Sequence, residues 1–409
     1  MAPYESDEST TVRRRKAGRY VVPVAVVGVA AGTIGLVPAL ADSGSPDLPK
    51  ITAQQLIQKI AESDVERLSG TVKITTDLGL PDLGGLEGAL GGAAATAPGG
   101  DGDGDGSTAD PSAKLTELVT GTHTLRVAAD GPDRQKLSVL ENAAEYSLIH
   151  NGKDVWGYDS ASNEVFHGTA EETGERAGEP PATPKDFAEQ ALKAVDDTTS
   201  VTVDGTAQVA GRDAYKLVIE PKQSGSTVGA ITIAVDAKTW MPLKFTLTPA
   251  SGGAAVVDAG FTQLSYARPA ASTFDFTPPK GAKVTEESEE GEAGRQPIAP
   301  TDEADPAKGL DKGFGEAFGQ DSEGMKVIGE GWNSVAVFDT GGPGLPSGDE
   351  VGGDLGGFLD SLGDQVKGDF GSGTVFKTRL INALITDDGK IYAGAVTQEA
   401  LVKAADAGQ

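Results

Sequence analysis

The sequence predicts an α+β protein whose main element is a wide antiparallel sheet. Three runs of strand length, separated by polar or glycine-rich breaks, lie near the middle of the chain: Ala214–Pro221, Ile231–Asp236 and Trp240–Leu247. In the third run, Leu243, Phe245 and Leu247 alternate with polar side chains. A period of two places apolar side chains on one face of a strand and polar ones on the other. This pattern is typical of an antiparallel sheet with one buried face.

The first half of the chain predicts a helix followed by six strands. Apolar residues recur at helical spacing over 51–61, and Thr52 is placed to cap the first turn, so we expect a helix there. A strand is expected over 65–78. Turn residues such as Asn151-Gly152, which favour a tight hairpin, separate the remaining strand-like runs. These runs cover residues 118–128, 135–140, 145–150, 155–158 and 165–167.

Residues 79–112 interrupt this pattern, because they are dominated by Gly, Ala and Asp. Leu83, Leu86 and Leu90 recur at helical spacing within this flexible insert. Two interpretations stay open: a disordered surface loop, or a mobile flap that covers an apolar opening.

The second half of the chain predicts the rest of the sheet, a linker and a small module. Thr183-Pro184 opens a second helix over 185–195, because proline is tolerated in the first helical turn. A strand over 256–266 follows the three central strands. Residues 283–325 are rich in Glu, Gly, Pro and Asp, which predicts an acidic disordered linker. The small α+β module over 326–409 is expected to contain a strand at 332–339, a helix along Leu355, Phe358, Leu359, Leu362 and Val366, a hairpin at 374–396, and a last helix capped by Thr397.

Charge and cysteine content limit the classes of function. The 409 residues include 34 Lys and Arg against 61 Asp and Glu, which gives a net charge of −27. A chain this acidic repels polyanions at long range, so we expect no binding to nucleic acid. The chain has no cysteine, so we expect neither a disulfide framework nor thiolate chemistry.

Residues 1–41 resemble a secretion leader. The basic run Arg13-Arg14-Arg15-Lys16 precedes an apolar stretch over 21–40, which closes with Ala39-Leu40-Ala41 as a cleavage-like site. The apolar stretch is also long enough to span a bilayer if it is not cleaved. The segment is therefore either a signal peptide or a signal anchor. Because the basic flank stays in the cytoplasm, we expect the rest of the chain outside it, secreted or anchored to the cell membrane.

No pattern in the sequence indicates catalysis. The three histidines, His123, His150 and His167, are too widely spaced for a local metal motif. The acidic run at 101–106 imitates the start of a calcium loop, but position 12 would be Ser112 instead of the required glutamate. Neither a nucleophile elbow nor a zinc-protease motif occurs. We expect a protein that is not an enzyme and needs no cofactor or metal.

Several segments together resemble the LolA/LolB/RseB superfamily. They are the run AYKLVIEPK at 214–222, the run ITIAVDAKTWMPLKFTL at 231–247, the closing FDFTPPKG at 274–281, and the helix and strand over 51–77. The chain looks most like the actinobacterial LolA-like, outer-membrane-lipoprotein-carrier-like proteins. The resemblance covers roughly residues 50–284, within a domain expected over 42–282. The module at 326–409 resembles the small C-terminal domain of RseB-type regulators.

The resemblance implies a curved antiparallel half-barrel sheet with helices on its concave face, joined to the small C-terminal α+β module. Members of this superfamily bind acyl chains or lipidated proteins in that concavity. An apolar hollow of this kind would stabilise a bound acyl chain by about 0.8 kcal/mol per buried methylene. No residue roles are transferred from the superfamily to this chain.

The candidate ligand-binding residues follow from the alternation pattern. Leu80, Leu83 and Leu86 are expected to cover the opening, whereas a set of aromatic residues is expected to face inward. The aromatic candidates are Trp156, Tyr158, Phe166, Trp240 and Phe245. For each of them, an ordinary core role is the competing interpretation.

Three functions remain open from the sequence. The first is extracytoplasmic binding or carriage of lipids or lipoproteins in an apolar cavity, with a lipid or lipidated protein as partner. The second is an RseB-like envelope sensor that regulates a membrane anti-sigma factor, which adds a membrane protein as partner. The third is a wall-associated interaction protein with no ligand.

Overall fold

A computed structural model provides the structure of this chain. Within it, Pro46–Gln409 form one compact unit. No helix in the described ranges is long and apolar enough to span a membrane, and the predicted leader lies outside these ranges. The structure describes residues 45–79, 109–111, 114, 118, 120–169, 183–193, 195–286, 326–339 and 363–408.

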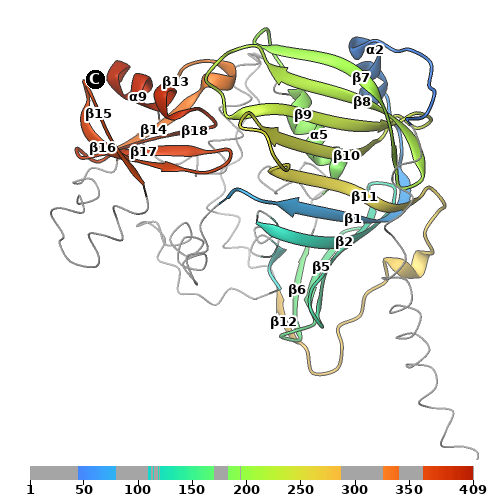
Figure 1. Ribbon diagram of the computed structural model, residues 1–409. Helices are drawn as coiled ribbons and strands as arrows, with labels where there is room; N and C mark the ends of the chain where they lie inside the picture. The colour runs from blue at the N-terminus through green and yellow to red at the C-terminus, as the bar shows by residue number, and fades with distance from the viewer. Residues whose placement is uncertain are drawn as a thin grey trace, which may run out of the picture. The chain divides into compact units, whose positions relative to one another are not determined.

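Twelve strands of the described chain form one large sheet (Figure 1). Their spatial order is β12-β6-β5-β4-β3-β2-β1-β11-β10-β9-β8-β7. Every neighbouring pair is antiparallel except β12 and β6, which run parallel. The bounds are β1 (Arg67–Thr76), β2 (Gly121–Asp130), β3 (Arg134–Leu140), β4 (Glu145–Asn151), β5 (Asp154–Asp159), β6 (Glu164–Thr169), β7 (Thr199–Val209), β8 (Arg212–Pro221), β9 (Val228–Asp236), β10 (Pro242–Pro249), β11 (Val257–Ser265) and β12 (Lys283–Glu286).

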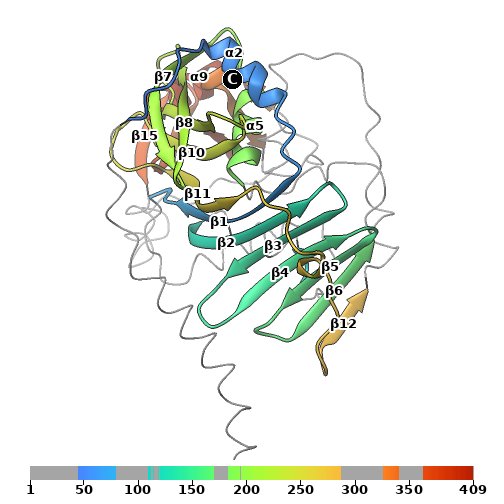
Figure 2. The ribbon, with the colours of Figure 1, turned by 90° about the vertical axis from the view of Figure 1, so that its right-hand side faces the viewer.

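The large sheet is unclosed and curved. Its outermost strands, β12 and β7, each pair on one side only within the described chain. Figure 2 shows that the sheet bends near β1 and β2, so that β3–β6 run at an angle to β8–β10. The predicted wide antiparallel sheet is thus confirmed, and its open, curved form fits a half-barrel.

The register of the strands gives the sheet one apolar face. Val72 lies opposite Leu125 on β2, Leu125 lies opposite Val139 on β3, and Val139 lies opposite Tyr146 on β4. Directly opposed residues share a face, and all four of these side chains are buried. We call this the apolar face, and we call the opposite one the polar face.

Two short helices pack on the apolar face. α2 (Ala53–Ala61) begins at a capping box in which Thr52 and Gln55 exchange hydrogen bonds, and it buries Leu56 and Ile60. α5 (Pro184–Lys193) contacts β10 and β11 and stacks the ring of Phe187 on Phe245, with ring centroids 5.1 Å apart. Both predicted helices are therefore present, and both contribute side chains to one apolar cluster with β8–β10.

Six strands from the C-terminal part of the chain form a second sheet, and one helix packs against it. Its order is β13-β14-β18-β17-β16-β15, and the helix α9 (Gln398–Ala407) contacts β15, β17 and β18. Thr397 caps α9, as predicted. The strands are β13 (Lys326–Ile328), β14 (Val335–Asp339), β15 (Asp364–Gly368), β16 (Gly371–Lys377), β17 (Asn382–Thr386) and β18 (Lys390–Gly394).

Several local expectations differ from the structure. The strand β7 was not predicted, and the hairpin expected at 374–396 contains three strands, β16, β17 and β18. The predicted helix through Leu355–Val366 does not include Val366, which is buried in β15; its other positions lie outside the described residues. The strand expected at 332–339 begins only at Val335, because 331–333 form a 3-10 turn. The predicted linker begins inside β12, because residues 283–286 pair with β6.

Backbone hydrogen bonds connect the two sheets within the compact unit. The turn between β8 and β9 meets the connection between β18 and α9, where Thr227 N donates to Ala395 O at 2.9 Å and Thr397 N donates to Gly225 O at 2.7 Å. Arg379, between β16 and β17, binds the carboxylate of Asp77 at 2.6 Å.

Candidate functional site

The structure divides the candidate binding residues among several places. Leu80, Leu83 and Leu86 lie outside the described residues. Phe166 and Phe245 lie on the apolar face: Phe166 is opposite Gly157, and Phe245 is opposite Ile233 and Ala259, which are both buried.

Trp156 and Tyr158 lie on the polar face instead of facing inward. Tyr158 is opposite Ser147, which is in turn opposite Ser138. Along β5, the buried positions are Val155, Gly157 and Asp159, so the two aromatic residues have the other phase of the alternation. The sequence pattern was ambiguous here because both phases of this strand contain apolar residues.

Phe276, in the segment between β11 and β12, packs against both of these aromatic rings. The ring of Phe276 lies 5.5 Å from that of Trp156 and 5.7 Å from that of Tyr158. The imidazole of His167 also stacks on the indole of Trp156, with ring centroids 3.8 Å apart. These contacts describe a small aromatic cluster on the polar face.

The packed apolar interface between the sheet and the two helices is the candidate site for an acyl chain. On the sheet side, Leu217, Ile219 and Ile233 are fully buried there, from β8 and β9. On the helix side, α2 contributes Leu56, and α5 contributes Ala188 and the ring of Phe187. Every one of these side chains is aliphatic or aromatic, so the interface suits contact with a hydrocarbon.

Trp240 lines a groove beside α2, next to this apolar interface. The groove has a volume of about 640 Å³ and also includes Leu48, Ile51 and Lys59. The indole of Trp240 stacks on Tyr215, with ring centroids 6.0 Å apart, and the ammonium of Lys59 lies 4.3 Å from the ring centroid. The predicted site residue Trp240 therefore lies at the rim of the helix–sheet interface, near the exposed side of α2.

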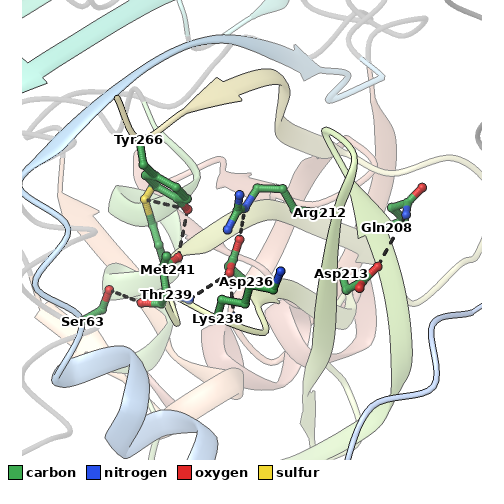
Figure 3. A network of polar contacts seen from close by, with 9 residues as sticks. All are labelled: Ser63, Gln208, Arg212, Asp213, Asp236, Lys238, Thr239, Met241 and Tyr266. Carbon is green, nitrogen blue, oxygen red and sulfur yellow. Dashed lines mark hydrogen bonds and ion pairs between the residues drawn. The ribbon is translucent and has the colours of Figure 1, made fainter. Parts of the chain in front are cut away.

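A buried carboxylate fixes the turn that presents Trp240 (Figure 3). Asp236, only 1% exposed, ends β9 and accepts hydrogen bonds from the backbone nitrogens of Lys238 at 2.8 Å and Thr239 at 2.9 Å. Its other oxygen binds the guanidinium of Arg212. The turn places Trp240 at a φ of +62°, a conformation that bulky residues rarely adopt.

The hydrogen bonds to Asp236 favour its ionised form. Burial by itself would raise the pKa of Asp236, but the hydrogen bonds from Arg212 and the two backbone nitrogens outweigh burial and lower it below 3.8. The neighbouring phenol of Tyr266 hydrogen-bonds Thr239 at 2.9 Å and lies under Arg212, 4.5 Å from ring centroid to guanidinium carbon. Burial is the main reason that the pKa of Tyr266 is raised.

Sequence reasoning missed this polar network. An Asp followed by Ala-Lys-Thr at the end of a strand is a recognisable signal for a side-chain-stabilised turn, so Asp236 could have been found. Arg212, at the start of β8, and Tyr266, just after β11, are distant in sequence from Asp236, and only the tertiary structure brings them to the carboxylate. Within the ranges that the structure describes, no cluster of His, Asp and Glu side chains could hold a metal ion.

Comparison with known proteins finds no matching family model and no matching curated protein. Similar solved structures include the MucA/MucB complex of Pseudomonas aeruginosa, with a TM-score of 0.38 and 15% identity over 86% of this chain and 96% of that chain. A LolA superfamily protein from Nitrosomonas europaea has a TM-score of 0.21 and 11% identity, over 56% and 99%. An outer membrane lipoprotein-sorting protein domain from Vibrio parahaemolyticus has 0.20 and 11%, over 52% and 91%.

Proposed function

We propose that this chain, whose sequence resembles the LolA/LolB/RseB superfamily, binds the acyl chains of lipids or lipidated proteins outside the cytoplasm. The acyl chain would lie on the concave, apolar face of the curved sheet, between strands β8–β10 and the helices α2 and α5. The observation that carries this proposal is the buried apolar cluster that β8–β10 share with two short helices, which cover this part of the sheet in place of a second sheet.

Short helices make this cover easy to displace. α2 has nine residues and α5 has ten, and isolated helices of fewer than about 12 residues are marginally stable in water. Their stability therefore comes from packing against the sheet. An acyl chain that replaces the helix contacts supplies equivalent apolar contacts, so opening the interface costs little net burial.

The proposal is tested by analysis of lipid bound to the purified full chain. Mass spectrometry of the native protein should show bound acyl lipid, and exhaustive delipidation should lower the melting temperature because the apolar site loses its occupant. Native and delipidated protein that share the same mass and melting temperature would contradict the proposal and favour the interaction protein with no ligand.

A pair of variants locates the site. Phe187→Ser places a hydroxyl on α5 where the ring now stacks on Phe245, and we expect a fluorescent fatty acid to bind about tenfold more weakly. Phe376→Ser, in β16 of the second sheet, changes the same residue type at another half-buried position and serves as the control. Equal affinity of the two variants would place the acyl site elsewhere.

One observation favours the envelope sensor as a second candidate function. The strands β8 and β9 line the proposed acyl site, and the turn that joins them hydrogen-bonds the β18–α9 connection. A structural change caused by ligand at the site would thus be transmitted to the second sheet through these backbone hydrogen bonds. Hydrogen exchange at the amides of Thr227 and Thr397 should slow when the delipidated full chain receives lipid; unchanged exchange would contradict the sensor.

A further inference from the structure

The polar face of β1–β3 carries a group of cationic side chains. Arg67 lies opposite Asp130, Thr71 lies opposite Arg126, and Ala128 lies opposite Lys136. These residues share one face because opposed and alternate positions of paired strands point to the same side. Arg134 and Arg268 join them through Asp130, and we call the set the basic face: Arg67, Arg126, Arg134, Lys136 and Arg268.

One carboxylate holds three of these arginines. The side chain of Asp130 is 3% exposed and binds Arg67 at 3.2 Å, Arg134 at 3.2 Å and Arg268 at 3.0 Å. The hydrogen bond from Arg268, with the charges of Arg134 and Arg67, lowers the pKa of Asp130, so the carboxylate stays ionised. It neutralises one of the three positive charges. Arg67 and Arg268 remain more than half exposed, and their remaining donors are available to an anion.

A groove adjoins this cluster on the same face. It has a volume of about 520 Å³, and its lining includes Arg126, Lys136, Ser69, Thr71 and Ser138. Arg126 is 62% exposed and reaches Glu145 only at 3.9 Å, whereas Lys136 makes no ion pair with any residue that the structure describes. The lining also includes the carboxylate of Glu145, and the hydroxyl of Ser138 is buried and hydrogen-bonded to Ser147 at 2.9 Å. The two cations together with the hydroxyls of Ser69 and Thr71 supply the chemistry that binds a phosphate-bearing headgroup.

Aromatic and apolar side chains continue the basic face toward β6. Trp156 and Lys136 both lie opposite Ile149 on β4, so the indole is two strands away from the ammonium on the same side. Tyr158 lies on this face as well, and Val284 of β12, which is 41% exposed, lies two strands away from it across Val165 of β6. Trp and Tyr next to Lys and Arg are typical of surfaces that bind at the interface of a bilayer.

The basic face is opposite in sign to the chain as a whole. The chain carries −27, whereas the basic face has five cations beside the carboxylates of Asp130 and Glu145; the aromatic end of the surface adds Asp154 and Glu286 around His167. A membrane with anionic lipids repels most of the surface and attracts this face, so the electrostatic field orients the approach.

From these observations we propose that the basic face docks on the surface of a bilayer containing anionic phospholipid. The groove would take up a headgroup, the arginines around Asp130 would contact neighbouring phosphates, and the aromatic cluster would lie at headgroup level. This proposal rests on the proposed acyl-binding function for its purpose, because docking brings the acyl site to the membrane where lipid is exchanged.

Vesicle sedimentation of the full chain tests the docking. Binding to vesicles with phosphatidylglycerol should exceed binding to pure phosphatidylcholine vesicles and should weaken as salt rises. The double variant Arg126→Gln/Lys136→Gln should bind the anionic vesicles at least about tenfold more weakly. The control Lys193→Gln/Lys403→Gln removes the same charge from exposed positions on α5 and α9, and it should bind like the unmodified chain.

Both double variants retain the basic leader, so any binding of the leader to the vesicles contributes equally to both. Equal weakening by the two double variants, or equal binding to both kinds of vesicle, would overturn the docking proposal. Melting temperatures show whether each variant is folded, and Lys136→Gln alone replaces the double variant if that one is destabilised. Lipid analysis separates the two proposals: Arg126→Gln/Lys136→Gln should retain bound acyl lipid, whereas a chain that docks but never contains lipid would refute only the acyl site.

Discussion

At the scale of single residues, Asp236 controls the geometry beside α2. Its carboxylate satisfies two backbone nitrogens of the β9–β10 turn and pairs with Arg212, so the turn keeps Trp240 at a positive φ. Trp240 in turn lies against Tyr215 and Lys59. The cost of this conformation is offset by a buried, fully hydrogen-bonded charge.

Asp236→Asn should lower the free energy of unfolding by about 2–4 kcal/mol, because Arg212 would lose its buried partner. The folded-state pKa of Asp236 lies below 3.8, so its stabilisation is present at neutral pH and is lost as the pH falls through the folded value. Chemical denaturation at pH 7 and near pH 3 measures both effects, and the difference between variant and unmodified chain should shrink in acid. The control is Asp213→Asn, an exposed carboxylate next to Arg212 on β8, which should change stability by less than about 0.5 kcal/mol.

At the scale of elements, β12 is held on the edge of the large sheet by a histidine. His167 on β6 contacts Glu286 of β12 at 2.6 Å through Nδ1 and Asp154 of β5 at 3.2 Å through Nε2. Burial lowers the pKa of His167, but the hydrogen bonds and charges of the two carboxylates outweigh burial and raise it above 6.5. Lys283 and Glu164 form a second ion pair between the same two strands, at 3.4 Å.

The attachment of β12 should therefore weaken as the pH rises. A raised folded-state pKa means that the contribution of His167 is fully present below pH 6.5 and is lost as the pH passes the folded value. Because both carboxylates are more than half exposed, we expect a change of only about 0.5–1 kcal/mol. Protection factors of the amides at 283–286 should fall between pH 6 and pH 8. His167→Gln should remove this dependence and His150→Gln should retain it; the same pH profile in both variants would contradict the assignment to His167.

At the scale of the whole molecule, the β8–β9 turn connects the two sheets. Gly225 has a φ of +99°, and a Cβ added there would meet Asn333 Oδ1 at 3.4 Å and Ala400 Cβ at 3.8 Å. Only glycine adopts this conformation without strain, and it leaves the carbonyl of Gly225 in place to accept from Thr397 N.

Gly225→Ala should destabilise the connection by about 1–3 kcal/mol and speed hydrogen exchange at Thr227 and Thr397. Gly252→Ala is the matched control, because Gly252 also has a positive φ but a Cβ there would meet nothing within 4 Å. The control should lower the melting temperature without changing exchange at these two amides. Unchanged exchange in Gly225→Ala would show that this turn does not determine the contact between the sheets.

Local patterns in the sequence predicted most strands of the large sheet, the two helices that pack on it and the cap of α9, because alternation, helical spacing and capping each depend on neighbours a few residues apart. They did not predict β7, β12 or β15. The tertiary structure decided what depends on distant partners. It placed β12 parallel to β6, assigned Trp156 and Tyr158 to the polar face, and brought Arg212 to Asp236 and three arginines to Asp130. Alternation reports that a strand has two different faces; only the pairing of that strand with its neighbours decides which face is buried when both phases contain apolar residues.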